Sequence, residues 1–239
     1  MEELVIIDYL NQFGLTRQES AIYVCLIQNS ALTGYEVAKQ TGISRSNVYS
    51  ALSGLVEKGA AYVMEGNATK YIPVKIEEFC NNKIHSMELI KTDLVKKMPK
   101  VTEETDGYIT IEGYKHIMDK FHHMIMGAKQ RIYISVSATM IPMLKQDIIE
   151  TVNRGCKAVV ITNAPFSEKG VKVHISQDIK ETGIRLIVDS SYVLTGEITQ
   201  SGTDTCLYSG QKNFVEVFKE ALRNEIKLAE LTKGESGNE

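Results

Sequence analysis

The sequence lacks the features that mark several large classes of protein. It has no run approaching the roughly 20 apolar residues that span a bilayer, and its first residues, Met1-Glu2-Glu3, are acidic where a secretory signal is basic. Its four cysteines are widely scattered and form no C-x-x-C pair, which argues against a zinc ribbon or a redox pair. We therefore expect a cytoplasmic protein with free, buried or half-buried thiols and with no cofactor or bound metal.

An excess of positive charge is lacking too. The chain has 27 Lys and Arg against 30 Asp and Glu, a formal net charge of −3. Residues 1–75 hold six basic residues against seven acidic ones, whereas many DNA-binding domains are plainly basic. Any contact with DNA must then use few cations, backbone N–H groups at helix N-termini, and more than one copy of the chain.

What is present indicates two compact units and a connector, the usual organisation for 239 residues with 43% hydrophobic content. Residues 1–75 predict short helices followed by a hairpin. Residues 76–104 predict a connector that is mostly one long helix. The polar residues 102–107, which end in Gly107, indicate a hinge. Residues 105–239 alternate strands and helices, as an α/β domain does.

Helix signals in the first region follow one another closely. Thr16, with Glu19 three residues later, forms a capping box. Gly42 stands where a tight turn demands positive φ. Ser44 is a suitable N-cap for the next helix, which ends at Gly59. A short helix, a glycine turn and a second capped helix predict a helix-turn-helix.

The helix over residues 44–59 has two different faces at about 100° per residue. Its apolar face carries Val48, Leu52, Leu55 and Val56. Its outward face carries small polar residues, with Arg45 in the first turn: Ser46, Asn47, Ser50 and Ser53. Such a face can approach the major groove closely, and Arg and Asn can pair with base edges or phosphates.

Two apolar runs, residues 60–64 and 70–74, surround a Gly-Asn turn and predict a β-hairpin. Following a helix-turn-helix, this hairpin is a wing. We expect Lys70, together with Asn67 and Thr69, to reach the DNA backbone beside the groove.

Residues 13–23 and 41–59 together resemble the winged-helix domain of TrmB-type transcriptional regulators. The first run follows G-L-T-x-x-E with a tyrosine four residues later, and the second follows R-S-x-V-Y-x-x-L-x-x-L-x-x-K-G. The resemblance implies a DNA-binding face made by Arg45, Ser46, Asn47, Tyr49 and Ser50. The alternative is a winged helix that binds protein, which the modest charge would fit. Steep salt dependence of DNA binding separates the two.

The connector predicts one continuous helix from Glu77 to Met98, between Pro73 and Pro99. Its apolar residues recur three, four or seven apart, with Lys91 interrupting them: Ile76, Cys80, Ile84, Met87, Leu94 and Met98. A helix of about 22 residues spans roughly 33 Å, close to the separation of two half-sites one DNA turn apart. We expect it to pair two subunits in a homodimer; the alternative is packing on its own C-terminal domain.

The C-terminal region resembles one half of a phospholipase D fold, which accompanies the winged helix in TrmB-like proteins. The enzymes of that fold need His-x-Lys-x-x-x-x-Asp. Placing the aspartate on Asp189 puts Thr182 and Ile184 where His and Lys should stand, and neither can act as nucleophile or phosphate anchor. None of the five histidines has Lys two residues later. We expect no enzyme; the alternative, a phosphodiesterase or nuclease, is decided by a phosphodiester hydrolysis assay.

The inactive domain would then sense a small molecule or only assemble the dimer. The weak candidates for a polar effector pocket are Ser135, Ser137, Asp189 and Thr195; the alternative is a turn aspartate with solvated hydroxyls. His116, His122 and His123 share a predicted helix, but no further ligands complete a metal site. Family members that sense sugars carry an additional C-terminal region, so the resemblance speaks against a sugar effector here.

Overall fold

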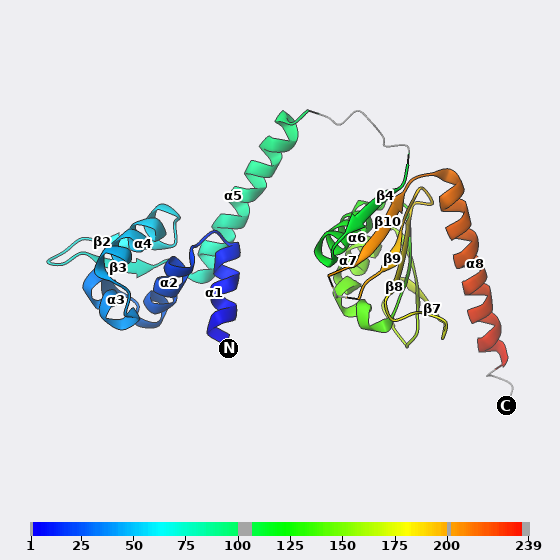
Figure 1. Ribbon diagram of the computed structural model, residues 1–239, viewed down its shortest axis with the longest axis horizontal. Helices are drawn as coiled ribbons and strands as arrows, with labels where there is room; N and C mark the ends of the chain where they lie inside the picture. The colour runs from blue at the N-terminus through cyan, green and yellow to red at the C-terminus, as the bar shows by residue number, and fades with distance from the viewer. Residues whose placement is uncertain (1, 100–106, 200–201, 236–239) are drawn as a thin grey trace. The chain divides into compact units, whose positions relative to one another are not determined.

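The computed structural model describes residues 2–99, 107–199 and 202–235. The chain divides into two compact units, Met1–Val101 and Thr102–Glu239 (Figure 1). The predicted hinge lies outside the described residues apart from Gly107. Among the helices that the structure describes, none is long and apolar enough to cross a membrane.

The N-terminal unit has the predicted winged helix-turn-helix. Helices α3 and α4 form the helix-turn-helix, and strand β3 pairs antiparallel with both β1 and β2. The elements are α1 (Glu2–Gln12), α2 (Arg17–Asn29), β1 (Leu32–Thr33), α3 (Gly34–Thr41), α4 (Arg45–Glu57), β2 (Ala61–Met64), β3 (Lys70–Pro73) and α5 (Ile76–Lys97). Sequence reasoning missed α1 and the short strand β1.

The capping predictions are confirmed with one exception. Thr16 and Glu19 form the predicted capping box at the start of α2, and Gly42 takes φ +68° after α3. The prediction that the side chain of Ser44 caps α4 is wrong, because it makes no hydrogen bond to the start of the helix. Its Oγ lies instead 3.4 Å from the Oγ of Ser46.

Glu19 joins the start of α2 to the end of α4. Its Oε2 accepts the backbone N–H of Thr16 at 2.6 Å and lies 2.6 Å from Nζ of Lys58, while its side chain is only 8% exposed. Burial raises the pKa of Glu19, but the hydrogen bonds from Lys58 and Thr16 outweigh burial and leave the pKa below its usual value. A Cβ on Gly54 would overlap Oε1 of Glu19, so glycine at that position lets the carboxylate approach α4.

The first turns of α5 are anchored in the core of the N-terminal unit. Phe79 is 2% exposed and packs on Tyr23 and Phe13, with ring centroids 5.9 and 6.4 Å apart. The hydroxyl of Tyr23 donates to the carbonyl of Val74 at 2.7 Å, just before the helix begins. The helix therefore leaves the winged-helix core from a fixed starting point.

The C-terminal unit is built on a seven-stranded mixed sheet of order β4-β10-β9-β8-β5-β6-β7. Strands β5, β6 and β7 are parallel, and the remaining neighbours are antiparallel. The elements are β4 (Ile109–Glu112), α6 (Tyr114–Gly127), β5 (Arg131–Val136), the 3-10 turn η1 (Ala138–Met140), α7 (Ile141–Asn153), β6 (Lys157–Thr162), β7 (Val171–Ile175), β8 (Gly183–Val188), β9 (Tyr192–Glu197), β10 (Thr205–Ser209) and α8 (Lys212–Glu235).

Helices cover both faces of this sheet. Helices α6 and α7 lie on one face and α8 on the other (Figure 1). The larger apolar cluster packs Phe121 and Leu144 against Ile134 of the sheet, and a smaller cluster packs Leu222 of α8 against Ile187. The α/β class and the β8–β9 hairpin are as predicted, whereas β7 was missed.

Replacing Gly54 with Ala tests the junction at Glu19. A helical Gly→Ala change alone is worth about 1 kcal/mol of stabilisation, but overlap with a held carboxylate costs about 1–3 kcal/mol. We expect Gly54→Ala to lower the free energy of unfolding, measured by urea denaturation with circular dichroism. Ser53→Ala, at an exposed neighbour in the same helix, is the control and should not destabilise. Equal stabilisation by both substitutions would mean that Glu19 moves freely.

Candidate nucleic-acid interface

The outward face of α4 is a stripe of serines. Val48, Leu52 and Leu55 are fully buried, and at about 100° per residue the opposite side carries Ser46, Ser50 and Ser53, all exposed. Arg45 and Tyr49 lie on one flank of this stripe and Asn47 on the other, and all three are exposed. The face holds no acid before Glu57, so the first three turns can approach phosphates without repulsion.

The start of α3 supports the flank made by Arg45 and Tyr49. The Arg45 guanidinium carbon lies 4.7 Å from the centroid of the Tyr35 ring, a cation–π contact that limits where Arg45 points. A Cβ on Gly34 would come within 2.5 Å of the Tyr49 ring. The bare backbone at Gly34 thus lets Tyr49 lie against α3 while half of its side chain stays exposed.

Tyr35 and Gly34 are the two residues of this surface that sequence reasoning missed. Their signal was weak, because both follow Thr33 within an ordinary capping box. Only the packing of α3 on α4 brings Gly34 and Tyr35 beside Tyr49 and Arg45. The side chain of Ser44 leaves the first N–H groups of α4 uncapped, and such groups at a helix N-terminus favour phosphate oxygens.

The wing carries one lysine, Lys70, which we predicted to reach the DNA backbone. Lys70 is half-buried at the start of β3, opposite Thr33 of β1. Hydrogen bonds from Thr33 lower the pKa of Glu36, and the nearby charge of Lys70 lowers it further. The Lys70 charge is thus close enough to Glu36 to favour the ionised carboxylate. Asn67 and Thr69, which we predicted to reach the DNA backbone, are exposed in the hairpin loop.

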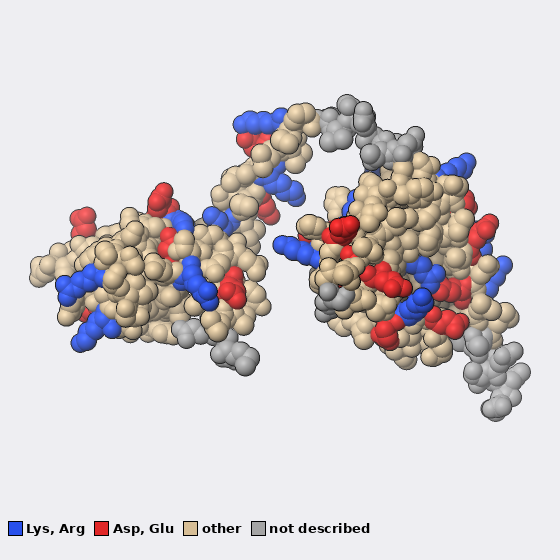
Figure 2. Space-filling model, viewed as in Figure 1, with Lys and Arg blue, Asp and Glu red and all other residues tan. Residues whose placement is uncertain are grey.

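Charge of both signs is dispersed over each unit on the face shown in Figure 2. This pattern agrees with the formal charge of −3 for the chain. Helix α4 is therefore not marked by a concentration of positive charge. Its distinguishing features are small side chains and the absence of acidic residues before Glu57.

Helix α5 carries an exposed apolar stripe beyond its anchored start. Phe79 is its one buried side chain among the described residues. The stripe comprises Ile76, Ile84, Met87, Ile90, Leu94, Val95 and Met98, each at least 48% exposed, with Lys91 among them. Leu89 is also 60% exposed but projects from the opposite side at about 100° per residue.

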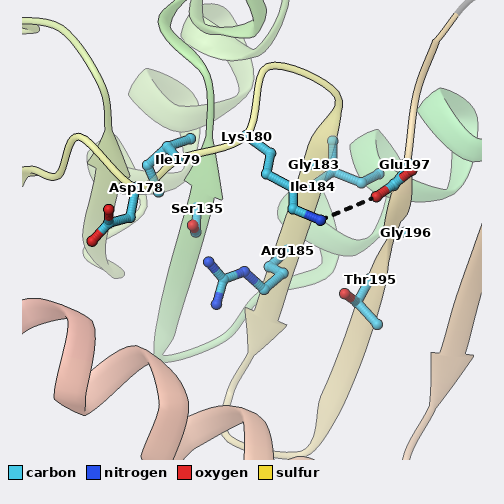
Figure 3. A pocket seen from close by; sticks show the side chains of 10 residues that line it. All are labelled: Ser135, Asp178, Ile179, Lys180, Gly183, Ile184, Arg185, Thr195, Gly196 and Glu197. Carbon is cyan, nitrogen blue, oxygen red and sulfur yellow. Dashed lines mark ion pairs between the residues drawn. The ribbon is translucent and has the colours of Figure 1, made fainter.

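Two of the four predicted effector residues meet in one pocket of the C-terminal unit. Ser135, Arg185 and Thr195 are direct partners across β5, β8 and β9, so they form one row on the face of the sheet that α8 covers. They line a cavity of about 260 Å³, shown in Figure 3. Its cations are already paired: Lys180 lies 3.7 Å from Glu197, and Arg185 lies 2.5 Å from Glu225.

The other two predicted effector residues do not line this pocket. Ser137 is fully buried beyond the end of β5, where its Oγ lies 2.5 Å from Oγ1 of Thr139. Asp189 lies at the opposite end of β5, in the β8–β9 turn with φ +51°. The sequence prediction of one polar cluster is corrected here, because antiparallel pairing of β5 with β8 separates the ends that carry these residues.

Asp189 has a clear structural role instead. Its two carboxylate oxygens accept the backbone N–H groups of Lys129, Gln130 and Arg131 at 2.8–2.9 Å. Burial raises the pKa of Asp189, but these three hydrogen bonds outweigh it, and the pKa lies below its usual value. The aspartate therefore closes the loop that leads into β5.

The histidines and cysteines form no cluster of interest in the described parts of the chain. No group of three or more His, Cys, Asp or Glu side chains there is arranged to hold a metal ion. His122 Nδ1 lies 2.7 Å from a carboxylate oxygen of Asp147. Cys80 is half-buried; the buried cysteines are Cys25, Cys156 and Cys206.

Two family models match the chain. Residues 10–77 match the sugar-specific transcriptional regulator TrmB, and residues 107–220 match the transcriptional regulator TrmB, EBD N-terminal subdomain. The uncharacterised protein YrhO of Bacillus subtilis (strain 168) is 25% identical over 237 residues, covering 95% of this chain and 86% of YrhO. The sugar-sensing transcriptional regulator TrmBL1 of Pyrococcus furiosus is 28% identical over 173 residues, covering 70% of this chain and half of TrmBL1.

Similar solved structures include TrmBL2, an archaeal chromatin protein that binds DNA. It is 20% identical, with a TM-score of 0.44, over 92% of this chain and 95% of that one. NucT from Helicobacter pylori is 11% identical, with a TM-score of 0.43, over 51% of this chain and 96% of its own.

Changing Asp189 to Asn separates its structural role from a ligand-binding one. Asn tolerates positive φ but offers one acceptor oxygen where three N–H groups need acceptors. We expect a loss of about 1–3 kcal/mol in stability and faster hydrogen exchange at residues 129–131, read by mass spectrometry. Asp178→Asn, at an exposed position in the pocket of Figure 3, is the control. Unchanged stability and exchange in Asp189→Asn would contradict the assignment.

Proposed function

The chain belongs to the TrmB family of transcriptional regulators, and we propose that it binds a two-half-site operator in double-stranded DNA as a homodimer. DNA-binding transcription regulation follows from the family; the dimer, the operator and the residues in contact are the proposal. The observation that carries it is the outward face of α4, where exposed small polar side chains extend over three turns with no acid.

On this proposal the serine stripe enters the major groove and its flanks read and position DNA. Asn47 on one side, and Arg45 on the other, have the side chains that pair with base edges or phosphates. Ser46 and Ser50 allow close approach, and Tyr49 packs against the sugar–phosphate backbone from its place on Gly34. Lys70 is half-buried and near the carboxylate of Glu36, so we assign the wing a lesser role.

Dimerisation supplies what one copy lacks. One N-terminal unit carries about as many acids as cations, so a single copy releases few counterions and binds weakly. The exposed stripe on α5 would pair two subunits, since apolar side chains at heptad-like spacing are stabilised by burial against a second helix. A helix of 22 residues spans roughly 33 Å, near the 34–36 Å between half-sites.

The C-terminal unit has no catalytic role in this proposal. The motif needed for phosphodiester hydrolysis is lacking: Thr182 and Ile184 occupy the positions of its His and Lys, and Ile184 is 1% exposed in the sheet. The unit serves assembly or control by a small molecule, and Ser135 and Thr195 remain candidates for a neutral polar ligand. Since DNA is its target, the protein would act in the cytoplasm.

Alanine at Arg45 and Asn47 tests the recognition face. The probe is a duplex selected from genomic fragments by the purified full chain. Loss of one base-reading side chain costs about 1–3 kcal/mol, or roughly 5- to 150-fold in affinity, measured by fluorescence anisotropy at several salt concentrations. Lys115→Ala, at an exposed position on α6, is the control and should bind like wild type. DNA binding that survives in both variants would mean that the recognition face is wrongly assigned. If no genomic fragment binds in a salt-dependent way, a protein-binding adaptor becomes the better interpretation.

Glutamate at Leu94 tests the dimer. A charge within the stripe should prevent pairing, so Leu94→Glu is expected to sediment as a monomer at micromolar concentration and to lose operator affinity by about tenfold or more. Leu89→Glu introduces the same charge at a leucine of similar exposure, 60% against 54%, on the opposite side of α5. It should remain dimeric. A monomeric wild-type protein, or equal disruption by both substitutions, would rule the α5 interface out.

A further inference from the structure

A second cavity in the C-terminal unit lies between the sheet and α8. It encloses about 320 Å³ and is lined by residues from β5, β8, the β8–β9 turn and α8. Its walls include Ile187 and Leu222, exposed by only 1% and 2%, and the half-buried Ile226. This volume is within the range of small-molecule sites, which combine apolar walls with a few placed polar groups.

Three cations line this cavity, and one of them is paired with a carboxylate. Arg131 comes from the start of β5, and Lys219 and Arg223 come from α8. Glu216 lies 2.7 Å from Lys219, and Arg223 adds to the positive charge around that same carboxylate. Among the described residues no carboxylate lies within ion-pair distance of Arg131 or Arg223.

A second carboxylate, that of Asp189, lies beside the cavity wall. Asp189 lies in the same turn as Ser190 of the cavity wall, but its oxygens accept three backbone N–H groups. Asp189 is held by the loop before β5 and makes no ion pair with Arg131 among the described residues. Counted against the carboxylates of Glu216 and Asp189, the three cations still leave a net positive charge at the cavity within the part of the chain that the structure describes.

A second arginine of the sheet, Arg185, is paired with a carboxylate from α8. Arg185 of β8 lies 2.5 Å from Glu225 of α8, and both are mostly buried. Two residues earlier on α8 stands Arg223, which lines the same cavity as Arg131 of β5. A glutamate at position 223 could pair with Arg131 as Glu225 pairs with Arg185, whereas an arginine adds a second positive charge. Like charges gathered around one cavity repel each other, and an anion placed between them relieves that cost.

We propose that this cavity binds a small organic anion, a carboxylate or phosphate group on an apolar body, as the effector of the regulator. Arg131 and Arg223 would hold the anion, Arg guanidinium groups being suited to bidentate binding of both groups. The hydroxyls of Tyr133 and Ser190 line the same cavity and can donate to it. The effector role rests on the proposed DNA binding, whereas the anion site stands without it.

Binding of phenyl phosphate, benzoate and inorganic phosphate to the full chain, measured by isothermal titration calorimetry, tests the site. Benzyl alcohol is the matched neutral probe. We expect phenyl phosphate or benzoate to bind and benzyl alcohol not to bind. The ratio of the dissociation constants of phenyl phosphate and benzoate distinguishes a phosphate from a carboxylate ligand. Arg223→Gln, at an exposed helix position, should weaken binding about tenfold, and Arg131→Gln likewise. Lys227→Gln, an exposed cation on α8 outside the cavity, should have no effect.

Equal binding of benzyl alcohol, or unchanged anion binding in both arginine variants, would overturn the site. Operator affinity with and without the bound probe tests the effector role separately. A shift of at least threefold that disappears in Arg223→Gln supports it, and an unchanged affinity overturns it. Should the chain bind no DNA while the arginines still govern anion binding, the proposed function fails and the anion site stands.

Discussion

The ion pair of Glu19 with Lys58 is the contact on which the geometry of the N-terminal unit depends. It joins two residues that lie 39 positions apart in sequence and so links α2 to the end of α4, and the same carboxylate closes the capping box of α2. With Gly54 leaving room for it, the angle between α2 and α4 has little freedom. Together with the core packing of Val48, Leu52 and Leu55, this contact gives the serine stripe of α4 a defined direction. A face of small side chains depends on such support, since it has few long side chains that can adapt to DNA.

Local signals in the sequence were sufficient for most of the fold. The capping box at Thr16, the glycine turn at Gly42 and the β8–β9 hairpin are each specified by residues within a few positions of one another. The missed strand β7 alternates Val171, Val173 and Ile175 with Lys and His, a period of two that was readable. Ser44 failed as a cap because its hydroxyl has a second partner nearby in Ser46, a competition that propensity alone does not resolve.

The candidate sites were harder to predict because they depend on long-range pairing. Tyr35 reaches Arg45, and Gly34 reaches Tyr49, only once α3 packs on α4. In the C-terminal unit, the antiparallel register of β5 with β8 puts Ser135 and Asp189 at opposite ends of one strand pair. The excess of cations around Arg131 is invisible in the sequence, since its members come from positions 131, 219 and 223. A low overall charge therefore conceals a locally positive cavity.

The contact between Gly34 and Tyr49 limits how the specificity of this protein can be re-engineered. A recognition helix transplanted from another winged-helix protein brings its own residue at position 49, while position 34 stays with the scaffold. A bulkier residue than glycine at 34 would displace the Tyr49 ring from α3, and a smaller one than tyrosine at 49 would leave a gap against α3. A transplant between winged-helix proteins should therefore carry α3 and α4 together, from Gly34 onward, and not α4 alone.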